Sequence, residues 1–180
     1  MEKILIIKGS NRKNGYTEKI CNEILKAAGE ENVQVFDSFN ASFKPCDGCN
    51  YCEEKGECRH RDLDAFFDSF EKADTVVFVS PVYNGTFSAP VKALIDRFQV
   101  YYTWFYKNGK VQKINKRRKG VLIAVSGRDG KDAFQYMKSQ LKFAFSILNI
   151  EFTNSFLCSG TDTLSDYDSV ICRIKKEFNV

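Results

Sequence analysis

The sequence lacks the features that would direct a chain into a membrane or out of the cell. No stretch of about 18 apolar residues is present, and no signal-peptide pattern precedes the first periodic segment. We therefore expect a cytoplasmic protein that does not bind a membrane. At 180 residues the chain is long enough to bury a substantial core, so we expect one domain over residues 1–180.

Histidine is scarce, and several nucleotide-binding motifs are missing. The single histidine, His60, is expected to face solvent without a role, and nothing around it indicates a hydrolytic triad. The absence of Gly-x-Gly-x-x-Gly and of Gly-Lys-Ser/Thr argues against a dinucleotide fingerprint and a P-loop. With a net charge of only +4, the composition does not favour a nucleic-acid partner.

The first thirty residues have the pattern of a strand, a loop and a helix. Residues 4–7 form an apolar run typical of a strand buried on both faces, and apolar residues recur at helical spacing from 20 to 28. The polar loop between them precedes a helix N-terminus, which favours an anion. A terminal phosphate monoester fits best, and a turn that caps the helix through Thr17 is the alternative. The candidate phosphate ligands are Ser10, Asn11, Arg12, Asn14, Gly15, Tyr16 and Thr17.

Strand and helix patterns alternate along the rest of the chain. Further strands are predicted at 33–37, 75–80, 120–126 and 150–157, and further helices at 63–70, 88–98, 134–148 and 164–178. The alternation predicts an α/β fold with a doubly wound, five-stranded parallel sheet and helices on both faces. Because one phosphate loop follows the first strand, we expect the flavodoxin-like order 2-1-3-4-5. The loops at 9–17 and 81–87 should then meet at the carboxyl ends of the strands.

Four of the seven cysteines are concentrated in a long loop at residues 44–61. They are Cys46, Cys49, Cys52 and Cys58, spaced Cys-x2-Cys-x2-Cys-x5-Cys. An odd total without a secretion signal argues against a disulfide framework. The first three repeat at the interval of bacterial ferredoxin loops, whereas structural zinc usually pairs two separated Cys-x2-Cys arms. The spacing favours iron, with zinc or free thiols as alternatives.

The other three cysteines are Cys21, Cys158 and Cys172. They fall within helix or strand patterns. We expect them to be small core residues rather than ligands.

Three segments together resemble the NADPH-dependent FMN reductase family of flavodoxin-like proteins. They are residues 9–12 with Thr17, residues 80–85, and residues 89–97. The resemblance implies that residues 10–17 hold the FMN phosphate, that residues 81–85 run along the isoalloxazine ring, and that the turn after the fourth strand touches its other edge. The implied ring contacts are Pro81, Val82, Tyr83, Asn84, Gly85, Ser126, Gly127 and Arg128. No side chain is needed as a catalytic acid or base, because the flavin does the chemistry.

The cysteine loop is similar to that of the iron–sulfur flavoproteins, a branch of the same family with a [4Fe-4S] cluster in the loop after strand two. The similarity implies that the four loop cysteines bind such a cluster, which exchanges electrons with FMN. It also implies ferredoxin or NAD(P)H as the electron donor, a quinone or another small molecule as the acceptor, and a homodimer or homotetramer. The alternative is an NAD(P)H-dependent FMN or quinone reductase without a cluster.

Aromatic and then basic residues interrupt the alternation at 101–119. Six aromatic residues fall between positions 98 and 106, and seven Lys or Arg residues between 107 and 119. The aromatic cluster suits core packing at a helix end, a cover for the flavin or a subunit interface. The basic run suits a solvated loop face, or a docking surface for acidic ferredoxin or the phosphates of a nicotinamide cofactor.

Overall fold

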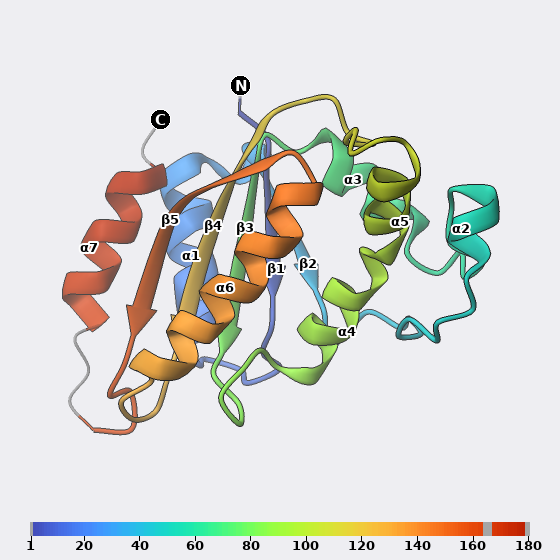
Figure 1. Cartoon of the computed structure of the whole chain (residues 1–180). Helices are drawn as coiled ribbons and strands as arrows, with labels where there is room; N and C mark the ends of the chain where they lie inside the picture. Colours follow the sequence, from blue (N-terminus) through green and yellow to red (C-terminus); the bar gives the residue numbers. More distant parts are fainter. Residues whose placement is uncertain (1, 164–166, 179–180) are drawn as a thin grey trace.

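A five-stranded parallel sheet forms the centre of the computed structural model, which describes residues 2–163 and 167–178 (Figure 1). The strand order is β2-β1-β3-β4-β5. The strands are β1 (Ile4–Lys8), β2 (Val33–Asp37), β3 (Thr75–Pro81), β4 (Arg118–Val125) and β5 (Ile150–Cys158). The predicted fold class and strand order are therefore confirmed.

Helices cover both faces of this sheet (Figure 1). On one face lie α1 (Tyr16–Ala28) and α7 (Tyr167–Phe178), and on the other lie α3 (Asp64–Lys72), α4 (Ala89–Arg97) and α6 (Lys131–Ile147). Successive residues of β1 alternate between the two layers: Ile6 belongs to the core beneath α1 and α7, and Leu5 to the opposite core. Of the helices described, none is long and apolar enough to cross a membrane.

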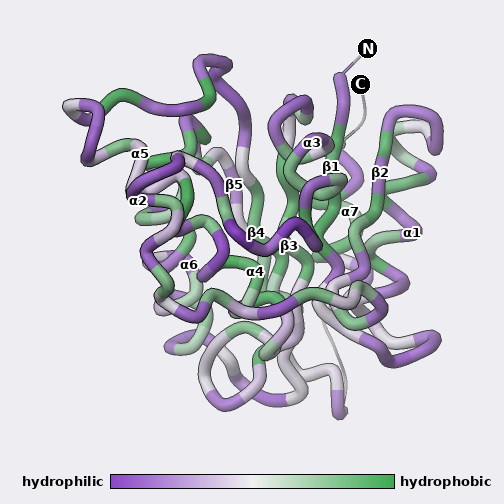
Figure 2. The backbone as a smooth tube through the Cα atoms, turned by 90° about the vertical axis from the view of Figure 1, so that its right-hand side faces the viewer, coloured by the Kyte–Doolittle hydropathy of each residue, from purple (hydrophilic) through white to green (hydrophobic). Residues whose placement is uncertain are grey.

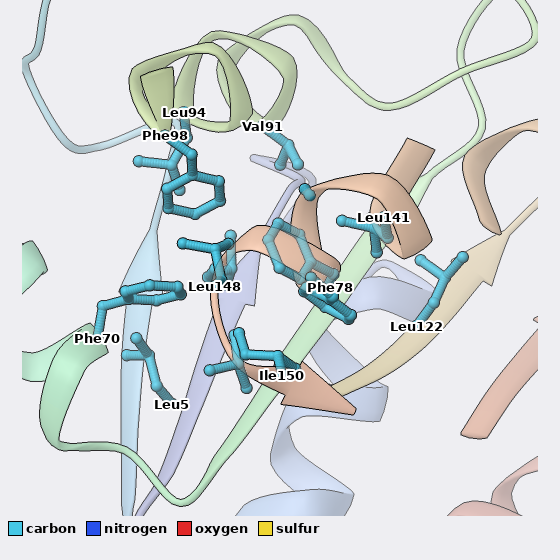
Figure 3. Close-up of a cluster of buried hydrophobic side chains, with 14 of the residues drawn as sticks. Leu5, Phe70, Phe78, Val91, Leu94, Phe98, Leu122, Leu141, Leu148 and Ile150 are labelled. Atoms are coloured by element: carbon cyan, nitrogen blue, oxygen red, sulfur yellow. The ribbon is translucent and has the colours of Figure 1, made fainter. Parts of the chain in front are cut away.

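The larger core fixes α4, which lies beside both candidate sites. Phe70, Phe78, Leu94 and Leu141 come from different elements and are fully buried (Figure 3). The rings of Phe70 and Phe98 stack with centroids 4.9 Å apart, just after the end of α4. Figure 2 shows that hydrophobic stretches concentrate inside the molecule and hydrophilic ones along the outer loops. Helix α4 is therefore anchored by its apolar stripe.

Three short helical elements are additional to those the sequence predicted. They are the 3₁₀ helix η1 (Glu30–Asn32), α2 (Tyr51–Lys55) within the cysteine loop, and α5 (Gln99–Lys107), which follows α4 directly. The aromatic residues from Tyr101 to Tyr106 therefore all lie within a helix. Core packing explains Phe98 and Tyr101, which are both 2% exposed, whereas Tyr106 is 49% exposed.

Arg118 is not part of a solvated basic loop, because it begins β4 and is buried. Its guanidinium donates hydrogen bonds to the carbonyl oxygens of Phe70 and Leu148. Burial lowers the pKa of Arg118 to about 10. The sequence prediction started this strand two residues too late, at the first uninterrupted apolar run.

The cysteines outside the loop divide into two environments. Cys21 and Cys158 are buried, as expected of small core residues. Cys172 is exposed, so the expectation was wrong for this residue. The buried stripe of α7 contains Ile171 and Ile174, and Cys172 follows Ile171 on the outer side of the helix.

Candidate flavin and cysteine sites

The loop between β1 and α1 is packed tightly against neighbouring elements. The Gly9 amide donates a 2.8 Å hydrogen bond to the carbonyl of Val79 on β3. A Cβ atom on Gly9 would come within 2.8 Å of Val91 Cγ2 on α4 and 3.0 Å of Ser80 Oγ. The beginning of this loop and the end of β3 therefore lie side by side at the carboxyl ends of the strands, as expected.

The same loop presents polar groups at the N-terminus of α1. Ser10 and Thr17 are nearly buried, whereas Asn11, Arg12 and Asn14 are exposed. Ser10 Oγ accepts a hydrogen bond from the Arg12 amide at 3.2 Å. The first-turn amides of a helix have no acceptor within the helix, so together with Arg12 they favour an anion here. The arrangement fits a terminal phosphate group.

Helix α1 begins at Tyr16, with Gly15 as its N-cap residue. Thr17 therefore lies inside the first turn, and no side-chain hydrogen bond caps the helix. The alternative in which this loop serves only to cap the helix through Thr17 is wrong. Tyr16 is half-buried, and its ring meets that of Tyr167 edge-on with centroids 5.0 Å apart.

The loop after β3 is fixed by backbone hydrogen bonds. The Val82 amide donates to the Val125 carbonyl at 2.7 Å, which attaches the loop to the end of β4. Tyr83 and Thr86 exchange backbone hydrogen bonds of 2.9 and 3.1 Å across a turn. In that turn Asn84 and Gly85 have φ angles of 49° and 80°. The turn leaves the Tyr83 side chain 38% exposed, so its ring is accessible to a ligand.

The loop after β4 completes this edge of the sheet. The Ser126 amide donates to the Cys158 carbonyl at 2.8 Å. A Cβ atom on Gly127 would lie 2.2 Å from the carboxylate of Asp162, so the loop after β4 and the loop after β5 approach each other closely here. Pro81 and Ser126 are buried, and Arg128 is exposed. The structure thus places the predicted flavin residues on three loops at the ends of the adjacent strands β1, β3 and β4.

The cysteine loop leaves the sheet after β2 and extends outward, carrying α2 beside α5 (Figure 1). Cys46, Cys52 and Cys58 are half-buried and Cys49 is exposed. All four line one cavity of about 550 Å³, and none of the predicted flavin residues lines it. In the described parts of the chain, no three His, Cys, Asp or Glu side chains converge as a metal site. Four thiols around one cavity nevertheless provide the donor set of an iron–sulfur cluster.

The opposite wall of this cavity is formed by α4, α5 and α6. It is largely apolar and includes Ile95, Tyr102 and Phe143. Thr103 Oγ1 on α5 lies 3.7 Å from Cys52 Sγ. Gln140 lines the same cavity, and its Oε1 lies 3.4 Å from Thr86 Oγ1 of the loop after β3. The Thr86–Gln140 contact therefore links the cavity wall to the candidate flavin loop after β3.

Basic residues after α5 contact the cysteine loop. Lys107 donates to the carbonyl of Glu53, and Lys113 donates to that of Gly56 at 2.8 Å. The Lys113 ammonium also lies 5.7 Å from the ring centroid of Trp104. These two lysines therefore hold the cysteine loop. The sequence had suggested only a solvated face or a docking surface for the basic run.

Asp47 joins the two ends of the cysteine motif. Its carboxylate lies 3.1 Å from His60 Nε2 and accepts hydrogen bonds from the Cys49 amide and the Arg59 guanidinium. The contact with His60 contributes most to holding the pKa of Asp47 well below its usual range, and the other two contacts act in the same direction. The His60 side chain is 16% exposed, so the expectation that it faces solvent was wrong.

Arg97 and Asp62 were missed by the sequence interpretation. Arg97 is 1% exposed, and its guanidinium lies 2.9 Å from an oxygen of Asp62. One signal could have found it, because Arg97 follows Leu94 at helical spacing on the apolar stripe of α4. A cation in that position indicates a buried polar partner.

The parallel sheet with a phosphate-type loop after β1 places the protein in the flavodoxin-like class of α/β proteins. Residues 2–155 match the family model described as NADPH-dependent FMN reductase. The chain belongs to this family of flavin-dependent oxidoreductases, which confirms the resemblance found in the sequence.

Individual relatives extend this comparison. An iron–sulfur flavoprotein from Methanocaldococcus jannaschii is 37% identical over 112 residues, which are 61% of this chain but only 58% of that protein. Another from Archaeoglobus fulgidus is 34% identical over 151 residues, or 81% of this chain and 72% of the relative. A solved NAD(P)H:quinone oxidoreductase from Methanothermobacter marburgensis has a TM-score of 0.72 at 16% identity, covering 98% of this chain and 93% of its own. The last likeness shows the common fold.

Proposed function

We propose that the protein is an FMN-dependent redox flavoprotein in which electrons pass between FMN and a [4Fe-4S] cluster on the cysteine loop. The observation that carries the proposal is that all four cysteines of the motif line one cavity, although they span thirteen positions of the chain. Membership of the FMN reductase family supports the flavin, and the names of the archaeal relatives support the cluster.

On this proposal, the three loops at the ends of β1, β3 and β4 hold FMN. The flavin supplies the redox chemistry, and the chain supplies orientation and electrostatics. Arg12 and the first-turn amides of α1 hold the phosphate, while the backbone of residues 81–85 and 126–128 orients the ring. Tyr83 offers an aromatic face. No side chain acts as a catalytic acid or base.

The proposed cluster ligands are Cys46, Cys49, Cys52 and Cys58, each as a thiolate. The wall that includes Ile95 and Phe143 places apolar surface beside the thiolates, and the polarity around a cluster is one means by which a protein sets its potential. The Thr86–Gln140 contact places one residue of that wall against the loop proposed to carry the ring.

The proposed electron donor is ferredoxin or NAD(P)H, and the proposed acceptor is a quinone or another small molecule. Three exposed aromatic side chains, Tyr106 on α5 with Tyr136 and Phe143 on α6, support assembly into a homodimer or homotetramer. The cytoplasm, where thiols stay reduced, is the compartment we propose.

Metal, sulfide and flavin analysis of protein purified without oxygen tests this function. We expect bound FMN with about four iron and four acid-labile sulfide per chain. Bound zinc without iron would contradict the proposed cluster and show that the cysteines form a zinc site. Bound FMN without metal would favour the second candidate, and protein without flavin would contradict both.

The second candidate is an NAD(P)H-dependent FMN or quinone reductase that has no cluster. It is favoured by the lack of a converged metal site in the described residues. In this case NAD(P)H reduces the flavin directly in metal-free protein. Reduction of the flavin by NADPH at an undiminished rate after iron chelation would support it.

A further inference from the structure

Arg97 is a buried cation beside the cysteine cavity. Its side chain is 1% exposed at the C-terminal end of α4, and the residue lines the cavity with the four cysteines. Burial of a guanidinium is costly unless its donors are satisfied. The two Nη atoms of Arg97 have acceptors, whereas its buried Nε has no hydrogen-bond partner. The acceptors of the Nη atoms show what the buried guanidinium holds together.

Those acceptors lie at the two ends of the cysteine loop. Arg97 Nη1 donates to the Lys44 carbonyl at 2.7 Å, before the first cysteine, and to Asp62 Oδ1 at 2.9 Å, after the last. Arg97 Nη2 donates to the His60 carbonyl at 2.9 Å. Asp62 Oδ2 in turn accepts the Lys44 amide at 2.8 Å. One guanidinium thus joins both ends of the loop to α4.

Asp62 is suited to this arrangement as an ionised carboxylate. Partial burial opposes its ionisation, but the Lys44 amide and the Arg97 guanidinium outweigh burial and lower its pKa. The planar fork of arginine holds its donors in fixed directions, whereas lysine offers three donors from a single nitrogen on a flexible stem. The geometry therefore depends on an arginine and not only on a positive charge.

We propose that Arg97 is the positioning residue of the cysteine site. Its guanidinium closes the base of the loop, so that the four thiols face one cavity before a metal binds. This inference deepens the proposed function and rests on it for the identity of the metal. Preorganisation of this kind lowers the entropy cost of gathering ligands from a flexible loop.

Through α4, Arg97 also connects the cysteine loop to the candidate flavin loops. Helix α4 follows the loop after β3, and its Val91 lies against Gly9 at the beginning of the phosphate loop. The same helix therefore contacts one candidate site near its first turn and holds the other from its last turn. Arg97 fixes the cysteine loop to an element that also borders the flavin loops.

The test compares Arg97→Lys and Asp62→Asn with Arg117→Lys. Arg117 is an exposed arginine paired with Glu151, so its replacement is the matched control. Each protein is treated with a chelator and a reductant, and alkylation of each cysteine is followed by mass spectrometry. Cys46, Cys52 and Cys58 report on the loop, while the buried Cys21 and Cys158 report on the core.

We expect Arg97→Lys to raise the alkylation rates of Cys46 and Cys58 by about tenfold, because charged hydrogen bonds at the loop base are lost. Asp62→Asn should raise them by about threefold, since an amide oxygen can still accept from Arg97. Cys21 and Cys158 should remain protected. Unchanged loop rates would overturn the inference, and so would joint exposure of the core cysteines, because Arg97 would then support the whole fold.

Metal and flavin contents give a second measurement on the same variants. Arg97→Lys protein purified without oxygen should lose most of its iron and sulfide but keep FMN, whereas Arg117→Lys should keep all three. Iron retained in full by Arg97→Lys would also overturn the inference. If the unaltered protein holds no iron, the proposed cluster fails, and the alkylation rates still decide whether Arg97 positions the loop.

Discussion

The candidate flavin loops, which follow β1, β3 and β4, and the cysteine loop are attached to the fold in different ways. Gly9 and Val82 fix their loops by donating backbone hydrogen bonds to neighbouring strands. The cysteine loop leaves the sheet and is held chiefly by the side chains of Arg97, Lys107 and Lys113. Attachment through the backbone follows from the strand order itself. Attachment through side chains depends on individual residues, and the two sites should therefore respond separately to mutation.

Removal of a proposed cluster ligand should have the largest effect. It should lower the iron and sulfide contents and leave the FMN content unchanged. Cys52→Ser replaces a half-buried thiol of the motif, so we expect almost complete loss of iron and sulfide with unchanged FMN content. Cys172→Ser, at an exposed cysteine on α7, is the control and should change neither. Equal iron in the two variants would remove Cys52 from the ligand set.

Gly9→Ala should weaken FMN binding and lower the stability of the fold without changing the iron content. The new methyl group would come within 2.8 Å of Val91 Cγ2 and 3.0 Å of Ser80 Oγ. Overpacking at a buried position costs about 2 kcal/mol of unfolding free energy and displaces the phosphate loop. Thermal unfolding and FMN titration measure the two effects, and iron content should stay constant. Simultaneous loss of iron would show that the two sites are not independent.

Arg12→Ala should weaken FMN binding by about tenfold, because a charge-assisted contact to the phosphate is lost. Lys13→Ala removes the adjacent exposed cation and serves as the control for a general charge effect. Fluorescence titration of the apoprotein with FMN compares the two variants. If both lose the same affinity, Arg12 contributes charge to the region and does not contact the phosphate.

Lys113→Met should have the smallest effect, again on the cysteine side. It removes the hydrogen bond to the Gly56 carbonyl and the ammonium near the Tyr101 and Trp104 rings. We expect the free energy of local opening around α2 to fall by about 1 kcal/mol. Hydrogen exchange of the α2 amides is the measurement, with Lys110→Met on the same basic run as control. Unchanged exchange would mean that Lys113 does not stabilise the loop.

The difference between backbone and side-chain attachment also explains which parts of the molecule the sequence could predict. The apolar runs at 4–7 and 75–80 identified strands buried on both faces, and the strand order followed from the alternation together with the phosphate loop after the first strand. Because the flavin loops begin where strands end, their positions followed as well. Short-range pattern was sufficient for this part of the molecule.

The support of the cysteine loop could not be predicted in that way. Arg97 meets Lys44, His60 and Asp62 across 35 to 53 residues of sequence, and two of these contacts are to backbone carbonyls. A carbonyl acceptor leaves no residue type to recognise. Helix α2 is equally hard to predict, because five residues are too few for an apolar period and the helix depends on packing beside α5.

The most direct test of cluster-to-flavin electron transfer is anaerobic reduction by a ferredoxin-type one-electron donor, followed through the flavin absorbance of the unaltered protein and of Cys52→Ser. Both samples are loaded with FMN to the same level. The account predicts rapid flavin reduction in the unaltered protein and much slower reduction in Cys52→Ser. Equal rates in the two proteins would contradict it.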